Sequence, residues 1–150
     1  MEITVMTCAH PLWEKTISFA ENCSWRAGVF LANMMRENRF SDIERVIVAH
    51  EGDNIAGFCT FSEKDALPED SGYTPFIGFV FVDKNNRGKR VSEKMIDKAS
   101  KYADDVEYEA VYIVSGEHGL YEKYGFEKIG ELETIYGDVD QLFIKVLTAK

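Results

Sequence analysis

The sequence predicts an α/β (α+β) fold, with a mixed, mostly antiparallel sheet of about seven strands flanked by about four helices. The 150 residues, 45% of them hydrophobic and 13% aromatic, are enough for one packed core. Segments with the period of a strand and segments with the period of a helix follow one another along the chain. Strand pairs joined by short turns outnumber strands joined through a helix, which favours an antiparallel sheet over a doubly wound parallel one.

The amino-terminal part of the chain is expected to form a strand and two helices. Residues 2–8 have the pattern of a short strand. Behind Pro11, apolar residues recur at helical spacing, which predicts a first helix with the buried residues Leu12, Trp13, Ile17 and Ala20. In the segment AGVFLANMMREN, one apolar face of a second helix is predicted to consist of Ala27, Phe30, Leu31, Met34 and Met35.

The middle of the chain predicts a hairpin and a central strand. The segments RVIVAHE (45–51) and NIAGFCTF (54–61) are joined through a Gly-Asp pair, a composition typical of turns between antiparallel strands. The polar residues 62–74 are expected to form a loop. The segment PFIGFVFV (75–82) is continuously apolar, so it is predicted to be a strand buried on both faces.

The rest of the chain predicts two helices and three strands. A third helix is expected to begin at Gly88 or Lys89 and to end at about Ala103 or Asp105. Its apolar stripe is Val91, Met95, Ala99, Tyr102 and Val106. A strand (110–114) and a short helix (118–125) that stops at Gly125 follow, and the strands 126–136 and 140–147 close the chain.

Composition restricts the classes of partner. With 26 acidic and 17 basic residues, a net charge of -9 and a pI near 4.8, the chain is expected to repel the phosphate backbone of nucleic acid. No apolar run approaches the roughly 18 residues that a membrane span needs, and no secretory leader is recognisable. No linker or repeat interrupts residues 1–150, so a single domain is expected.

The cysteines and histidines predict neither disulfides nor a metal site. The three histidines lack the local spacing of metal ligands. The cysteines are odd in number and widely separated, so they are expected to be reduced and buried in a cytoplasmic protein: Cys8, Cys23 and Cys59.

The turn between the central strand and the third helix is unusually basic. It contains Lys84, Arg87, Lys89 and Arg90 around Gly88. A helix amino terminus has unpaired N–H groups and a partial positive charge, so it attracts anions, and a glycine allows a ligand to approach the backbone. Cationic side chains at that end disfavour the helix unless an anion is bound. From the turn alone, a phosphate site and a solvated turn are equally supported.

Two segments resemble the GNAT superfamily of acyl-CoA-dependent N-acyltransferases. VDKNNRGKRVSEKMI is similar to the family's pyrophosphate loop, Q/R-x-x-G-x-G/A, and GLYEKYGFEKIGE is similar to its L-Y-x-K-x-G-F segment. The similarity covers roughly residues 76–130, and the predicted element order fits a GNAT-like fold. Asn85 stands where the loop usually has Gln or Arg, and Arg90 stands where it usually has Gly or Ala. Arg90 either limits how closely the cofactor approaches or supplies a further phosphate contact, and the second alternative is favoured.

The resemblance implies acetyl-CoA (coenzyme A) as co-substrate and a set of site residues. Backbone groups of Phe81 and Val82 would contact the pantetheine and stabilise the developing oxyanion. Tyr121 aligns with the tyrosine that commonly protonates the leaving thiolate, and His118 is a second catalytic candidate. Without the motif, Tyr121 would be interpreted as the buried side of a short helix. The pyrophosphate would be held by Arg87, Gly88, Lys89, Arg90, Val91 and Ser92.

The acceptor and the general base are less well specified. An acceptor lysine-like amine, with a pKa near 10.4, is mostly protonated at pH 7, so a base is expected. By residue type, the candidates are His50, Glu51 and Asp83. The resemblance places the acceptor near the first two helices and the last loop, where carboxylates and aromatic rings suit an ammonium group: Glu21, Trp25, Tyr136, Asp138 and Asp140.

The resemblance therefore predicts an N-acetyltransferase that acts on a primary amine of a small molecule or peptide, by direct attack in a ternary complex. The alternative is a non-catalytic acyl-CoA-binding or regulatory module with the same fold. No nucleic-acid or membrane partner is expected, and the resemblance leaves a homodimer open.

Overall fold

The structure, a computed structural model, describes residues 1–147. Seven strands, four α-helices and two short 3-10 helices follow one another in these residues. In chain order they are β1 (Glu2–Met6), α1 (Trp13–Asn22), α2 (Ala27–Arg36), β2 (Arg45–Glu51), β3 (Asn54–Ser62), η1 (Glu69–Ser71), β4 (Phe76–Val82), η2 (Lys84–Asn86), α3 (Val91–Asp105), β5 (Ala110–Ser115), α4 (Leu120–Lys123), β6 (Glu127–Glu133) and β7 (Val139–Val146).

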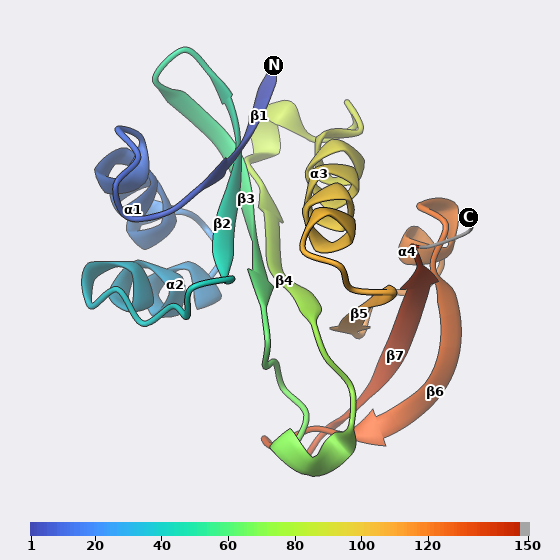
Figure 1. The fold of residues 1–150 in the computed structure, drawn as a ribbon. Coiled ribbons are helices and arrows are strands. Elements are labelled where there is room, and N and C mark those ends of the chain that lie inside the picture. Colours follow the sequence, from blue (N-terminus) through green and yellow to red (C-terminus); the bar gives the residue numbers. More distant parts are fainter. Residues whose placement is uncertain (148–150) are drawn as a thin grey trace.

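The strands form one mixed sheet in the order β1-β2-β3-β4-β5-β7-β6 (Figure 1). Every pair of neighbouring strands is antiparallel except β4 and β5, which run parallel. The predicted fold class, strand count and helix count are therefore confirmed. The strand predicted to be central, β4, is the fourth of the seven.

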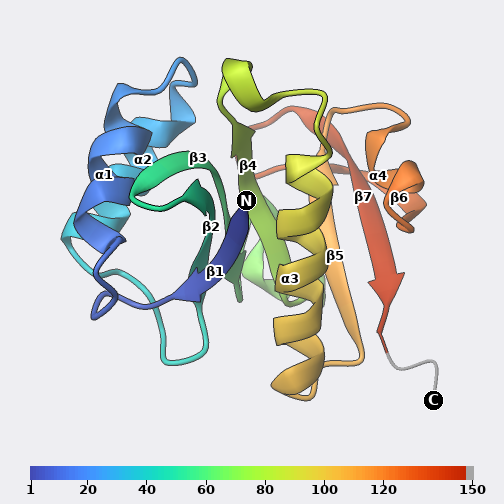
Figure 2. The same ribbon diagram turned by 90° about the horizontal axis from the view of Figure 1, so that it is seen from above.

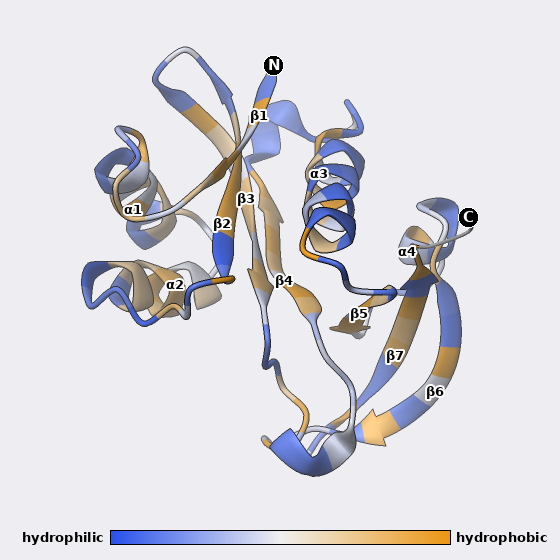
Figure 3. Ribbon diagram, viewed as in Figure 1, coloured by the Kyte–Doolittle hydropathy of each residue, from blue (hydrophilic) through white to orange (hydrophobic). Residues whose placement is uncertain are grey.

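The helices cover the two faces of the sheet separately. Helices α1 and α2 lie on one face and α3 lies on the other, as the view from above shows (Figure 2). Each face has its own core: Trp13 and Leu31 pack under α1 and α2, whereas Met95 and Ile96 pack under α3. Figure 3 shows hydrophobic residues concentrated on the strands and hydrophilic residues on the outer turns of α3. None of the described helices is long and apolar enough to cross a membrane.

The buried face of α2 overlaps the predicted face only at Leu31 and Met35, while Ala27 and Met34 are half-buried. Phe30 is 68% exposed, and the buried residues are Gly28, Leu31, Ala32 and Met35. A Cβ at Gly28 would lie less than 3.0 Å from the carbonyl oxygen of Ala20. This glycine therefore allows α2 to approach α1 closely, which rotates Phe30 out of the core and onto the rim of the cleft described below.

Two further predictions need correction. Helix α3 begins at Val91, not at Gly88 or Lys89, because Gly88 (φ +79°) and Arg90 (φ +60°) have left-handed backbones that cannot continue a right-handed helix. Of the cysteines, only Cys59 is buried, while Cys23 is partly exposed and Cys8 is exposed. Strand β1 ends at Met6, so Cys8 lies in the turn that follows it.

Candidate active site

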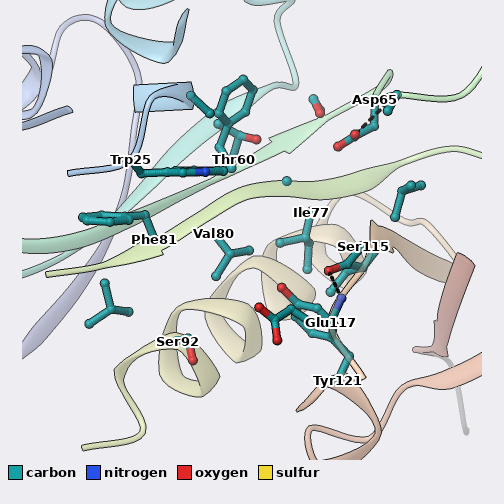
Figure 4. A pocket seen from close by; sticks show the side chains of 18 of the residues that line it. Trp25, Thr60, Asp65, Ile77, Val80, Phe81, Ser92, Ser115, Glu117 and Tyr121 are labelled. Atoms are coloured by element: carbon teal, nitrogen blue, oxygen red, sulfur yellow. Dashed lines mark hydrogen bonds between the residues drawn. The ribbon is translucent and has the colours of Figure 1, made fainter. Parts of the chain in front are cut away.

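A cleft of about 1640 Å³ opens between β4 and β5 (Figure 4). The two strands are joined by the register pair Phe76 and Tyr112 and by a hydrogen bond of 3.0 Å from the Tyr112 N–H to the Pro75 carbonyl. Beyond this point no register pair joins them, and residues 77–82 and 113–115 line the opening. Hydrogen-bonding groups of the β4 backbone that would otherwise pair with β5 are therefore available to a ligand.

Strand β4 contains a bulge where it lines the cleft. Phe81 pairs with Phe58 and Gly78 pairs with Thr60, so Phe79 and Val80 face a single residue of β3. Phe79 has a left-handed backbone (φ +49°), which is unusual for a bulky residue and occurs at positions held by the surrounding structure. A bulge leaves one residue without its ladder bonds and re-aims its neighbours. Sequence reasoning placed the backbone contacts at Phe81 and Val82 and missed this bulge, for which the apolar run carries no signal.

The basic turn provides amides at the start of α3. Arg90 is the N-cap and makes no side-chain capping bond, and its carbonyl accepts the first helical hydrogen bond, from the Lys94 N–H at 3.2 Å. The N–H groups of the first helical turn, including those of Val91 and Ser92, therefore have no partner within the helix. Gly88 has open space around its Cα. Gly88, Val91 and Ser92 line the cleft, so this turn can receive an anion there.

The cationic side chains of the turn are placed differently from one another. Arg87 donates from Nε to the Val82 carbonyl at 2.9 Å, and its guanidinium lies 5.7 Å from the ring centre of Phe81. Arg90 makes a two-pronged ion pair with Glu93, at 2.5 and 2.9 Å. Both arginines line the cleft. Lys89 is exposed and is not among the lining residues.

Tyr121 lies on the opposite wall from β4, in helix α4. Its side chain is only 5% exposed and packs against Phe126 and Phe143. Burial raises the pKa of the phenol to about 12, while the nearby Ser115 side chain acts in the opposite direction. At neutral pH the phenol is therefore protonated and can donate a proton. The neighbouring Tyr124 hydroxyl makes a 2.8 Å hydrogen bond with Ser92.

His118 does not lie in the same wall. It is exposed and, unlike its neighbours Glu117 and Leu120, does not line the cleft. Of the candidate bases, His50 hydrogen-bonds with the Thr4 hydroxyl at 2.7 Å and with the Gly52 carbonyl at 2.8 Å. None of the three, His50, Glu51 and Asp83, lines the cleft.

Aromatic and acidic side chains also line the cleft. Trp25 stacks on Phe81 with a centroid distance of 6.0 Å and an interplanar angle of 7°, and it also contacts Phe58 and Phe79. Four of the five predicted acceptor residues line the cleft: Trp25, Tyr136, Asp138 and Asp140. The fifth, Glu21, is paired with Arg36 on the outside of α1 and α2.

Four carboxylates that sequence reasoning did not single out also line the cleft. They are Glu44, Glu63, Asp65 and Glu117. They come from three separate segments, with Glu44 before β2, Glu63 and Asp65 after β3, and Glu117 after β5, and no local motif connects these segments. Only the folded sheet brings them together. Burial raises the pKa of one of them, Asp65, to about 6.

Comparison with known proteins gives a consistent result. A model of the acetyltransferase (GNAT) domain matches residues 42–128. No curated protein matches the sequence significantly. Among solved structures, the chain is similar to the aminoglycoside 6'-N-acetyltransferase from Enterococcus faecium (TM-score 0.77, 16% identity, covering 100% of this chain and 99% of that one).

Two other solved structures are also similar. One is an aminoglycoside 6'-N-acetyltransferase complexed with coenzyme A (TM-score 0.74, 14% identity, 100% and 99% of the two chains). The other is the ribosomal-protein-alanine N-acetyltransferase from Brucella melitensis (TM-score 0.62, 18% identity, 98% and 100%). At these identities, the likeness establishes the shared fold.

Proposed function

The chain belongs to the GNAT acetyltransferase family, and we propose that it transfers acetyl from acetyl-CoA to a primary amine of a small molecule or peptide, by direct attack in a ternary complex. As a family member it is an acetyl-CoA-dependent N-acetyltransferase. The observation that carries the proposal is the opening between β4 and β5, which has unpartnered helix amides at one end and carboxylates at the other.

The residues on the two walls suit this reaction. The amides between Arg87 and Ser92 would hold the pyrophosphate, because they are donors at a helix amino terminus. The bulged backbone at Phe79 and Val80 supplies a candidate N–H donor for the oxyanion that develops on the thioester. Tyr121, which is protonated at neutral pH, would donate a proton to the departing sulfur.

The far end of the cleft suits a cationic acceptor. Its carboxylates attract an ammonium group, and the exposed Tyr136 offers an aromatic ring. The similar structures are named for aminoglycosides and for the alanine of a ribosomal protein, and amines of both kinds belong in the first set of acceptors to be assayed.

The proposal is tested by measuring thiol release from acetyl-CoA over a panel of amines, alongside calorimetric titration with CoA. We expect CoA to bind and at least one cationic amine to be acetylated. CoA binding without turnover on any amine would favour the non-catalytic acyl-CoA-binding module. Failure to bind CoA would remove both functions.

A further inference from the structure

Asp65 occupies the place beside β4 where a side chain at position 78 would lie. It belongs to the segment between β3 and β4, is partly buried, and lines the cleft (Figure 4). A Cβ built on Gly78 would lie less than 3.0 Å from Oδ2 of Asp65 and 3.5 Å from the Thr60 hydroxyl. The central strand has no carboxylate of its own, and the neighbouring segment supplies one over its only glycine.

The position of this carboxylate is fixed from several sides. The Ala66 N–H donates to Oδ1 of Asp65 at 2.6 Å, and the Ala66 carbonyl accepts from the Ile135 N–H at 2.7 Å. The next residue, Leu67, is 5% exposed and packs in a small core with Phe76. Oδ2 of Asp65 therefore remains available to a ligand. The backbone next to Asp65 is hydrogen-bonded to the turn between β6 and β7.

Charge around Asp65 also points to a cationic ligand. Within residues 1–147, no lysine, arginine or histidine forms an ion pair with it. Asp140 on β7 acts on it as a like charge, while β3 and β4 present the uncharged Thr60 and Gly78. An ionised carboxylate that is partly desolvated and unpaired gains most from an ammonium group.

We propose that Asp65 binds the ammonium group of the acceptor and accepts the proton that its nitrogen loses after attack. This assignment rests on the proposed acetyl transfer. Gly78 directly precedes the bulge at Phe79 and Val80, and a strand rises about 3.3 Å per residue. An amine held at Asp65 therefore lies next to the segment of β4 assigned to the thioester.

The proposed transfer removes two protons from the nitrogen and delivers one to the sulfur. The bound ammonium first loses one proton to solvent. The nitrogen lone pair then forms the N–C bond while the carbonyl π pair moves to oxygen, and the cationic nitrogen gives a second proton to Asp65. The C–S bond breaks with its electron pair on sulfur, which takes the phenol proton of Tyr121 as the carbonyl re-forms. Solvent then restores the protonation states of Asp65 and Tyr121.

Three variants test the assignment. Asp65→Asn keeps an oxygen for the Ala66 N–H but cannot accept a proton. Gly78→Ala keeps Asp65 but forces its carboxylate to move. The backbone at Gly78 is not left-handed, so alanine introduces no backbone strain there. Asp70→Asn is the matched control, because Asp70 is exposed, lies in the same β3–β4 connection and does not line the cleft.

We expect Asp65→Asn to lower kcat/KM at least 100-fold and Gly78→Ala to lower it at least tenfold, with CoA affinity within twofold of wild type. If alanine at position 78 acts through Asp65, the double variant is no slower than Asp65→Asn. The part of the acid limb of the wild-type kcat/KM profile that reports Asp65, expected near its pKa of about 6, disappears in Asp65→Asn and persists in Asp70→Asn, while the part set by the pKa of the amine remains in both. Wild-type turnover in Asp65→Asn with an unchanged acid limb would overturn the assignment and leave the proposed function intact.

A measurement without turnover separates the two proposals. With CoA bound, 1,3-diaminopropane is titrated while the carboxyl carbon of Asp65 is followed by NMR. We expect the resonance to shift and the Asp65 pKa to fall, since the ammonium stabilises the ionised form. If no amine is acetylated but this shift occurs, acetyl transfer fails and the ammonium site stands. An unmoved Asp65 resonance overturns the site.

Discussion

The two ends of the cleft have opposite charge preferences and are built in different ways. At the end proposed for the pyrophosphate, the donors come from one continuous segment, residues 83–92, and most of them are backbone amides. At the acceptor end, the carboxylates come from separate loops, and their positions depend on side chains. A site made of backbone is encoded locally, whereas a site made of side chains from distant loops depends on the whole sheet.

The largest expected effect on kcat comes from a substitution at Tyr121, which lies in the wall between the two ends of the cleft. Tyr121→Phe removes the proposed proton donor but leaves the ring that packs against Phe126 and Phe143. We expect kcat to fall by about 100-fold, within the usual range for a general acid, and CoA affinity to change less than twofold. Steady-state kinetics and calorimetry measure the two quantities. Tyr73→Phe, outside the cleft, is the control, and an active Tyr121→Phe enzyme would remove the acid role.

The second largest effect is expected from Gly88→Glu, at the end of the cleft proposed for the pyrophosphate. The carboxylate would repel a phosphate, and a side chain is strained at φ +79°. We expect CoA affinity to fall at least about 30-fold, because two like charges placed side by side in a binding site repel each other by about 2 kcal/mol or more. Gly52→Glu is a matched control, since Gly52 is also left-handed with open space but lies in the turn between β2 and β3. Equal CoA affinity in both variants would exclude the phosphate assignment.

The same contrast explains what could be predicted from the sequence. The fold class and the three regular helices followed from periodicity, and the motif placed Tyr121 and the basic turn. The start of α3 did not follow, because a left-handed backbone at Arg90 has no signature in an arginine. The bulge at Phe79 depends on the register with β3, and Asp65 depends on where a loop lies over Gly78. Local sequence patterns contain none of these three relations.

The carboxylate proposed for the acceptor should lower the stability of the free protein at neutral pH. Burial raises the pKa of Asp65 from an ordinary 3.8 to about 6, so the ionised form disfavours folding. The contribution of Asp65 to the free energy of unfolding should therefore fall as pH rises from about 4 to 6. From these values, Asp65→Asn should be more stable than wild type by roughly 1–3 kcal/mol at pH 8 and equally stable below about pH 4. Denaturation at several pH values measures this, and a pH-independent difference would contradict it.

The smallest expected effect concerns Arg90. At this residue the pyrophosphate end would bind its ligand through a side chain, as the acceptor end does. Its left-handed backbone costs an ordinary residue about 1 kcal/mol, and its guanidinium is already paired with Glu93. If that pair persists when the coenzyme binds, Arg90→Gly should change CoA affinity less than threefold, because the amides of the turn remain. If the guanidinium instead leaves Glu93 for a phosphate, the same variant should lose at least tenfold. Glu93→Gln separates these outcomes further: it should tighten CoA binding only in the second case, by freeing the arginine. Calorimetry on both variants then decides whether the turn binds through its backbone alone.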